Sequence, residues 1–453
     1  MKNNLKIYSA YYLGSLLEKR KIDPIILLEY FLSNYKKANT NTKLSFSKVL
    51  EKEAYKEALL SWKRQKSNQR LSFFDGIPIV WKDLIDINGF PGFAGSKLIE
   101  KIRKNEKVKN ATVVKIAKKN GLVSLAKTST VEFAFGGLGL NKSNKLPNNM
   151  MFNQLECVPG GSSSGAATAV FAGLSPLSIG TDTAGSIRIP AAWHSLVGFK
   201  PSTGTIPMNG VLPLSKSFDS IGTICKTVKD TKILYNILSN KENYEQLDFF
   251  NKIKIGFIYD FNYRQLDNYC KKKIELLISK MSKLNIEVHN IKLPELKEIN
   301  DLFSVNGSLV NYEAWKYWQR IIENNLNLID SNVVDRFLIG RSMKIRTVQN
   351  IRNKVRLLKK NIIKKFEVYD FFILPTLSFA PPSIRELKNK KEYHFFNNEV
   401  LNNTRGVNVF DLCAISLPMN LIKRKWLSVS IITKKNNEGK LLAVAEKIES
   451  ILL

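Results

Sequence analysis

The stretch from residue 158 to 224 constrains the fold more than any other part of this chain. It is rich in Gly, Ser, Thr and Pro and poor in charged residues, whereas the rest of the chain is rich in lysine. Such a composition suits a tightly turned, buried site better than a solvated surface. We therefore expect residues 158–224 to form the buried centre of the protein.

Helical and strand-like patterns alternate on both sides of this centre. Ser9 and the pair Asp23-Pro24 are typical helix starts, and apolar residues continue at helical spacing after each. Further helices are expected at about 52–66 and 111–120, strands within 73–86, 122–127 and 369–382, and a βαβ-like unit over about 253–294. The chain should close with the strand WLSVSII and the amphipathic helix KLLAVAEKIESILL. This alternation indicates an α/β protein with a largely parallel or mixed sheet.

The bulk composition is that of a globular protein. Of the 453 residues 44% are hydrophobic, enough for a sizeable core. The N-terminus lacks the apolar stretch of a signal peptide, and no 18-residue apolar window occurs, so we expect a soluble, cytoplasmic protein. The four cysteines are scattered and should be buried, reduced thiols, which fits that compartment. Metal-ligand spacing is absent, and we expect neither a metal nor a cofactor.

The charge is strongly basic, with 70 Lys and Arg against 39 Asp and Glu, a net of +31. Such an excess can indicate a nucleic-acid partner. Here the lysines are spread along the chain together with many asparagines, both of which have A-rich codons, and no nucleic-acid motif accompanies them. We favour compositional bias over a nucleic-acid partner.

The central segment lacks the common catalytic and phosphate-binding motifs. It contains neither GxxxxGK[ST], GxGxxG nor GxSxG. The chain has three isolated histidines, and His194, which lies inside the segment, is better explained as a packing residue than as a catalytic base. A serine hydrolase built here needs another base, and a lysine can serve if burial lowers its pKa.

Several motifs together resemble the amidase signature family. They are GGSSSG at 160–165, GTDTAGSIRIPAA at 180–192 and VGFKPSTG at 197–204, preceded by GIPIVWKDLID at 76–86. The two signature serines, Ser162 and Ser186, are 186 − 162 = 24 residues apart, which agrees with the family spacing. The resemblance extends over about residues 10–450.

The resemblance implies a catalytic triad. Ser186 would be the nucleophile, Ser162 a bridging serine that follows a cis peptide bond, and Lys82 the base. The oxyanion hole would consist of backbone N–H groups of Thr183, Ala184, Gly185 and Ser186.

Weaker roles follow for neighbouring residues. Asp182 and Arg188 resemble a charge network that fixes the nucleophile turn, and Ser163 would hydrogen-bond within the triad. Phe133 and Phe135 are candidates for the substrate pocket. The family commonly has glycine where Ala184 stands, and because alanine avoids the left-handed region we predict a negative φ at this position.

The implied fold is the amidase signature fold: an α/β domain whose large, mixed, mostly parallel twisted sheet has helices on both faces. We expect one domain over 1–453, with an N-terminal helical region (1–70), a signature core (71–230) and a C-terminal α/β part (231–453). A homodimer is a family-level expectation.

Two functions remain open. One is a general amidase that converts a small-molecule carboxamide to an acid and ammonia or an amine through an acyl-enzyme. The other is the A subunit (glutaminase) of a glutamyl/aspartyl-tRNA amidotransferase, which would supply a nucleic-acid link. We favour the general amidase, because that subunit usually has Gln after the signature Arg, where this chain has Ile189.

Overall fold

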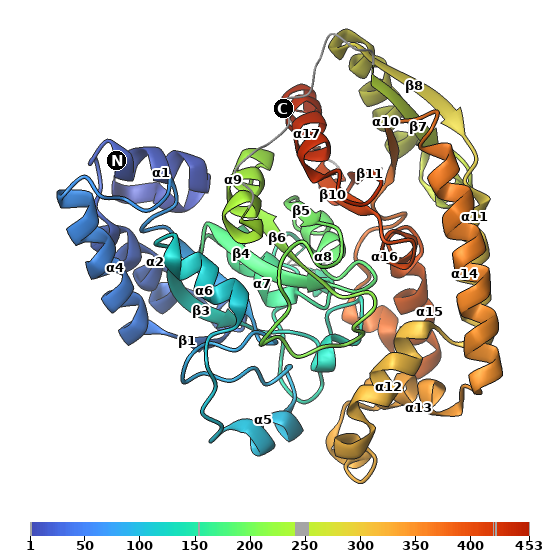
Figure 1. Cartoon of the computed structure of the whole chain (residues 1–453), viewed down its shortest axis with the longest axis horizontal. Coiled ribbons are helices and arrows are strands. Elements are labelled where there is room, and N and C mark those ends of the chain that lie inside the picture. Colours follow the sequence, from blue (N-terminus) through green and yellow to red (C-terminus); the bar gives the residue numbers. More distant parts are fainter. Residues whose placement is uncertain (1, 153–154, 241–252, 420, 422–423, 453) are drawn as a thin grey trace.

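A single mixed sheet forms the centre of the molecule. The computed structural model describes residues 2–152, 155–240, 253–419, 421 and 424–452. Within these residues eleven strands lie in the order β1-β3-β2-β4-β6-β5-β10-β11-β9-β7-β8 (Figure 1). The strands are β1 (Phe46–Val49), β2 (Pro78–Lys82), β3 (Val123–Thr128), β4 (Leu177–Asp182), β5 (Val197–Lys200), β6 (Ser220–Cys225), β7 (Ile253–Ile258), β8 (Ile286–Ile291), β9 (Phe371–Pro375), β10 (Cys413–Pro418) and β11 (Ser428–Thr433).

Helices surround this sheet (Figure 1). Those of the N-terminal half are α1 (Ala10–Glu18), α2 (Pro24–Lys37), α3 (Thr40–Lys43), α4 (Glu51–Lys66), α5 (Lys97–Arg103), α6 (Thr112–Lys119), α7 (Ser164–Phe171), α8 (Arg188–Ala192) and α9 (Val228–Ser239). Those of the C-terminal half are α10 (Asn268–Met281), α11 (Pro294–Asn306), α12 (Leu309–Ile322), α13 (Ser331–Ser342), α14 (Ile345–Lys365), α15 (Lys390–Leu401), α16 (Arg405–Val409) and α17 (Glu438–Leu452).

The helix starts follow the predicted caps. The side chain of Ser9 accepts a hydrogen bond from the N–H of Tyr12 at 3.2 Å, and Asp23 accepts one from Ile26 at 2.8 Å. Pro24 occupies the first turn of α2, where its missing N–H costs nothing. Both predicted N-termini are confirmed.

The direction of the strands differs from the expectation. Parallel pairs are β2–β3, β2–β4, β7–β8 and β7–β9, so the βαβ unit near residue 253 is confirmed. The other six of the ten described pairs are antiparallel. The mixed sheet is therefore confirmed, but most of its pairs are not parallel. Of these antiparallel pairs, only β10 and β11 are joined by a short connection, which favours antiparallel pairing. The other antiparallel pairs join strands that are farther apart in the sequence.

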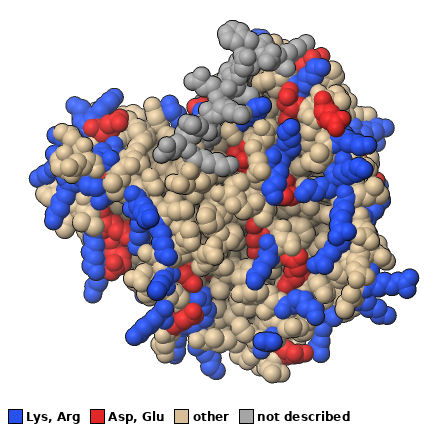
Figure 2. Space-filling view, in the orientation of Figure 1, with Lys and Arg blue, Asp and Glu red and all other residues tan. Residues whose placement is uncertain are grey.

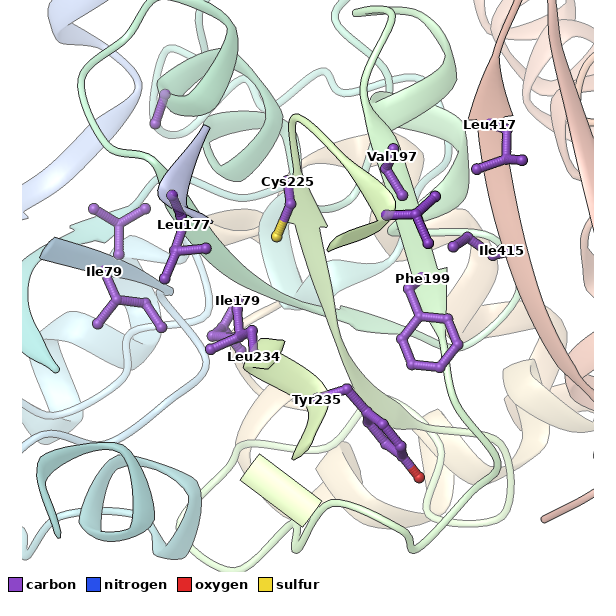
Figure 3. Close-up of a cluster of buried hydrophobic side chains, with 14 of the residues drawn as sticks. Ile79, Leu177, Ile179, Val197, Phe199, Cys225, Leu234, Tyr235, Ile415 and Leu417 are labelled. Atoms are coloured by element: carbon purple, nitrogen blue, oxygen red, sulfur yellow. The ribbon is translucent and has the colours of Figure 1, made fainter. Parts of the chain in front are cut away.

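Both faces of the sheet are covered. One face of β4 and β6 packs Leu177, Ile179 and Cys225 against Leu234 and Tyr235 of α9 (Figure 3). The other face packs Ile224 against small apolar residues of α7 and α8. Because successive strand residues point to opposite faces, neighbouring residues such as Ile224 and Cys225 enter different cores. Each fully buried large side chain contributes roughly 1.5–3 kcal/mol.

The central segment is buried as expected. Strands β4, β5 and β6 are buried at every residue, and so are all residues of α7 except Phe171. The four cysteines are buried and free, as predicted. Among the described helices, none is both long and apolar enough to cross a bilayer.

On the face that Figure 2 shows, basic side chains are not collected in one stripe. Figure 2 shows Lys and Arg scattered over most of the viewed face, with acidic side chains between them. Many of them form ion pairs, for example Lys36 with Glu51 and Lys354 with Glu298.

Candidate active site

Lys82 ends β2, the strand that lies between β3 and β4 in the sheet. Every residue of β2 is buried, and the Lys82 side chain has no exposed surface. Its Nζ lies 2.7 Å from Ser162 Oγ and 2.8 Å from Thr181 Oγ1. The apolar strand thus carries a lysine amine into a buried group of hydroxyls.

This environment changes the acidity of Lys82. Burial lowers the pKa of the amine to about 7, while the carboxylates of Asp219 and Asp182 act in the opposite direction. Desolvation dominates because the charged form loses its hydration. The neutral amine is therefore populated near pH 7. The carboxylate of Asp83, the next residue, pairs instead with Lys127 at 2.9 Å.

Lys82 differs from the other deeply buried lysines in its partners. Lys127 pairs with Asp83 and also donates to the carbonyl of Pro91 at 2.5 Å. Lys200 donates to the carbonyl of Pro201 at 2.5 Å. Of these three lysines, Lys82 alone contacts a serine hydroxyl within the described residues.

Ser162 lies in the turn that enters α7. A cis peptide bond joins Gly161 to Ser162, as the family resemblance implied. The Ser162 carbonyl accepts hydrogen bonds from Thr130 Oγ1 at 2.8 Å and from the N–H of Val131 at 3.3 Å. These bonds fix the backbone on which the Ser162 hydroxyl faces Lys82.

Ser186 lies in the turn between β4 and α8, which is built around the Asp182 carboxylate. That carboxylate accepts hydrogen bonds from the N–H groups of Gly185 at 2.7 Å and Ile187 at 3.1 Å. It also forms a two-point ion pair with Arg188, at 3.1 and 3.0 Å, and both side chains are fully buried. The turn holding Ser186 is thereby fixed at both ends.

The same network sets the charge of Asp182. Burial alone would raise the pKa of its carboxyl, but Arg188, Lys200 and Asn408 together outweigh burial and hold that pKa well below its usual range. Asn408, from α16, completes the arrangement. Its Nδ2 donates to Asp182 Oδ1 at 2.9 Å, and its Oδ1 accepts from Arg188 Nη2 at 2.6 Å.

Ser163 links the two serine segments. Its N–H donates to the Ser186 carbonyl at 3.1 Å, and its hydroxyl donates to the Thr181 carbonyl at 3.3 Å. The structure thus brings Lys82, Ser162 and the Ser186 backbone together. Within the described residues, the hydroxyls of Ser162 and Ser186 do not hydrogen-bond to each other.

The four expected oxyanion donors are not equivalent. The Gly185 N–H already donates to Asp182, so it is not a free donor, and this part of the expectation is corrected. For the N–H groups of Thr183, Ala184 and Ser186, the described part of the chain offers no acceptor. Three donors beside the Ser186 hydroxyl are therefore available to a ligand.

The backbone also explains which glycine the turn requires. Gly185 has φ +132°, and a side chain there would collide with Thr404 Oγ1. Ala184 is absent from the residues with positive φ, so the predicted negative φ is confirmed. Its carbonyl accepts a hydrogen bond from Thr404 Oγ1 at 2.6 Å. Of positions 184 and 185, only 185, directly before Ser186, needs glycine.

Ser186 opens onto a cavity of about 610 Å³. Thr183, Ala184 and Phe135 line the same cavity. Phe133 does not: it is 1% exposed and packs against Trp318 and Phe337, with ring centroids 5.0 and 5.4 Å away. Of the two phenylalanines considered for the pocket, only Phe135 lines it.

A second cavity, of about 670 Å³, includes Thr130, Asp83 and Lys127. It contains none of Lys82, Ser162 and Ser186. The cavity at Ser186 is therefore the candidate substrate site.

Sequence reasoning missed several residues of the site. Asp219 accepts from Thr183 Oγ1 at 2.5 Å, and its burial raises the pKa of its carboxyl to about 6. Thr181 contacts Lys82, and Thr404 and Asn408 reach the nucleophile turn from the C-terminal part of the chain. The motifs KSFDSIG and NTRGVNVFD contain three of these residues, but the spacing did not assign them roles.

Comparisons with known proteins identify the family of this chain. The family model described as Amidase matches residues 27–442. The 2-amino-5-chloromuconic acid deaminase of Comamonas testosteroni is 28% identical over 383 residues, which cover 83% of this chain and 82% of that protein. The A subunit of the glutamyl-tRNA(Gln) amidotransferase of Thermotoga maritima is 28% identical over 442 residues, 90% of each chain.

Solved structures show the same fold. A crystal structure described as an amidase has a TM-score of 0.87 at 26% identity, covering 98% of this chain and all of the other. The 6-aminohexanoate cyclic dimer hydrolase complexed with substrate has a TM-score of 0.85 at 21% identity, covering 99% and 98% of the two chains.

Proposed function

This chain belongs to the amidase family, whose members act on C–N bonds, and we propose that it hydrolyses a carboxamide with Ser186 as nucleophile. The products are a carboxylic acid and ammonia or an amine. The observation that carries the proposal is the contact of 2.7 Å between the buried amine of Lys82 and the Ser162 hydroxyl, beside the cavity that Ser186 lines.

The first step is attack on the amide carbonyl. Neutral Lys82 accepts the proton of Ser162 as Ser162 accepts the proton of Ser186, and Ser186 Oγ forms a bond to the carbonyl carbon. For this relay the two serine hydroxyls must come within hydrogen-bond distance, and rotation of the Ser186 side chain between staggered rotamers provides that movement. The N–H groups of Thr183, Ala184 and Ser186 stabilise the oxyanion, each worth roughly 3–4 kcal/mol.

The second half of the reaction releases the acid. Protonated Lys82 returns a proton through Ser162 to the leaving nitrogen as the C–N bond breaks, which leaves an ester on Ser186. Water, deprotonated by the same relay, attacks this ester and restores the Ser186 hydroxyl. The relay ends with its original proton count, and water is the one co-reactant consumed.

Covalent labelling tests the assignment. Ser186→Ala should lower amide hydrolysis by at least about 10⁴-fold and abolish reaction with a phosphonylating probe, while the fold survives. Ser279→Ala removes an exposed hydroxyl of α10 and serves as the matched control, with full labelling expected. Labelling of another serine, found by peptide mass spectrometry, would contradict the proposal.

The tRNA amidotransferase subunit is the second candidate, because several similar proteins carry that name and are aligned over most of this chain. Ile189 after the signature arginine favours the general amidase. Hydrolysis of simple amides by the chain alone distinguishes the two candidates.

A further inference from the structure

Two arginines from different elements share the cavity with Ser186. Arg336 comes from α13, and Arg405 begins α16. Both line the cavity, and each is only 8% exposed. The cavity therefore has two largely buried guanidinium groups on its wall.

Neither arginine forms a direct ion pair with a carboxylate among the described residues. Arg336 donates from Nη1 to the carbonyl of Phe135 at 3.0 Å, and Arg405 donates from Nη2 to the carbonyl of Asn398 at 3.4 Å. Arg188, in contrast, is fully buried and is paired at two points with Asp182. A buried guanidinium without a direct ion pair is costly, so a ligand carboxylate that contacts it directly would be bound strongly.

The nearby carboxylates are already occupied. Asp335, also on the cavity wall, accepts from Lys390 Nζ at 2.9 Å and contacts His394 Nε2 at 3.0 Å. Asp330 accepts the N–H groups of Lys142 and Asn332. Asp330 and Asp335 act on Arg336, and Glu399 on Arg405, only at a distance. None of these acids forms a direct ion pair with either arginine within the described residues, so both guanidinium groups can still receive a ligand carboxylate.

The two guanidinium groups also act on each other. Burial lowers the pKa of Arg405 to about 10, and the positive charge of Arg336 adds to this effect. Arg405 still carries its charge at neutral pH. The mutual repulsion would be relieved by an anion bound between them.

We propose that Arg405 and Arg336 bind a carboxylate of the substrate, so that the enzyme acts on a primary amide whose acyl part ends in a carboxylate. A guanidinium presents paired N–H donors that match a carboxylate. Leu214, Val310 and Leu401 line the same cavity and suit a short methylene chain between the amide and the acid. This inference rests on the proposed amide hydrolysis and adds the substrate class.

The arrangement also disfavours zwitterionic amino acids. An α-ammonium group would need a free carboxylate, and Asp335 is occupied by Lys390 and His394. A monoamide of a plain dicarboxylic acid should therefore be a better substrate than glutamine, which has the same terminal amide and an added ammonium group.

Kinetics test the substrate class. We would compare the monoamides of malonic to adipic acid with their methyl esters and with glutamine, by ammonia release. At the best chain length kcat/KM should favour the free acid over its ester by about tenfold or more. Arg405→Gln should bring this ratio close to one, and Arg405→Lys should retain part of it. Arg336→Gln is a second variant, and it should also lower the acid-to-ester ratio of kcat/KM.

A matched control shows that the effect belongs to the cavity. Arg341 also lies on α13, but its side chain is 54% exposed and contacts Glu323 at 3.5 Å. Arg341→Gln should leave the acid-to-ester ratio unchanged. An ester that reacts as well as the acid, or an Arg405→Gln ratio equal to that of the unmodified chain, would overturn the proposal.

Binding provides a readout without turnover. Glutarate should bind Ser186→Ala at least about tenfold more tightly than glutaramide in calorimetry, and Arg405→Gln in that background should remove the difference. Equal affinities would overturn the carboxylate subsite even if amides are hydrolysed. Arg405-dependent glutarate binding without hydrolysis of any amide would support the subsite and instead contradict the proposed function.

Discussion

At Lys82, burial and nearby charges shift the pKa of the amine in opposite directions. Desolvation lowers the pKa of the amine, while Asp219 and Asp182 favour its charged form. Asp182 is held by Arg188 and Asn408, whereas Asp219 accepts hydrogen bonds only from neutral donors, including Thr183 Oγ1. Asp219 is thus the carboxylate that can be changed without breaking the ion pair at the nucleophile turn.

The pH profile of the reaction should report this balance. The amine of Lys82 is charged below its pKa and neutral above it, so kcat/KM should rise with pH through about 7 and then level off. Asp219→Asn removes a carboxylate that favours the charged form, so the rising limb should move to lower pH. Lys82→Ala should remove the limb together with about 10²–10⁴-fold of the rate.

The control for the pH profile is a variant of Asp83, the acidic residue next to Lys82 in the sequence. Asp83 pairs with Lys127 rather than with Lys82, so Asp83→Asn should leave the limb where it is. The profiles would be measured as kcat/KM between pH 5 and 9 with a neutral amide. A limb that shifts to higher pH in Asp219→Asn, or persists in Lys82→Ala, would place the base elsewhere.

At the scale of elements, the nucleophile turn depends on contact with α16. Asn408 donates to both the carbonyl and Oδ1 of Asp182 at 2.9 Å and accepts from Arg188 at 2.6 Å. It lies 408 − 182 = 226 residues beyond Asp182 and is 1% exposed. One short helix of the C-terminal part therefore completes hydrogen bonding at a turn of the central segment.

Asn408→Ala should weaken both stability and catalysis. It removes these bonds and leaves the polar atoms of Asp182 and Arg188 buried with fewer partners, at a cost of roughly 1–3 kcal/mol. Because the turn positions Ser186 and its oxyanion donors, kcat should fall while KM changes less. Asn353→Ala, on the exposed face of α14, is the control. Urea unfolding and kinetics give both quantities, and an Asn408→Ala variant matching the control in both would refute this role.

Local signals in the sequence predicted most of the elements. Caps at Ser9 and Asp23, and the apolar run that became β2, depend on neighbouring residues and could be read directly. The direction of most strand pairs could not be predicted from the sequence, because it depends on where distant segments return to the sheet. The mixed sheet was therefore expected correctly, and its antiparallel majority was not.

The candidate site, too, could be predicted only in part from the sequence. The signature motifs gave Lys82, Ser162 and Ser186, which the fold brings to one region of the sheet. The contrast between Phe133 and Phe135 could not be predicted, since φ is +53° at Phe133 and +58° at Ala134 and the side chains do not follow a regular alternation. Asp219 and Asn408 are polar residues at distant positions, and their spacing carries no local signal.

At the scale of the whole molecule, all the groups that the proposed reaction uses belong to this chain. Lys82, Ser162, Ser186 and Asn408 come from four separated segments of the polypeptide, and hydrogen bonds connect these segments around the nucleophile turn. The basic charge of +31 is spread over the surface, with no single stripe on the face that Figure 2 shows. Non-specific attraction to nucleic acid is the effect expected of such a surface.

The purified chain should therefore hydrolyse a simple amide without ATP, tRNA or a partner. Added tRNA should bind weakly at low salt, and that binding should fall steeply between 50 and 200 mM salt, because it depends on counterion release. Hydrolysis should keep its rate over the same salt range, since the reacting groups are buried and screened little by ions. Ammonia release and filter binding, measured side by side with and without tRNA, separate the two effects. Activity that appears only with glutamine, charged tRNA and a partner protein would instead identify the chain as part of an amidotransferase. In that case the rate of turnover should fall with salt together with the affinity for tRNA.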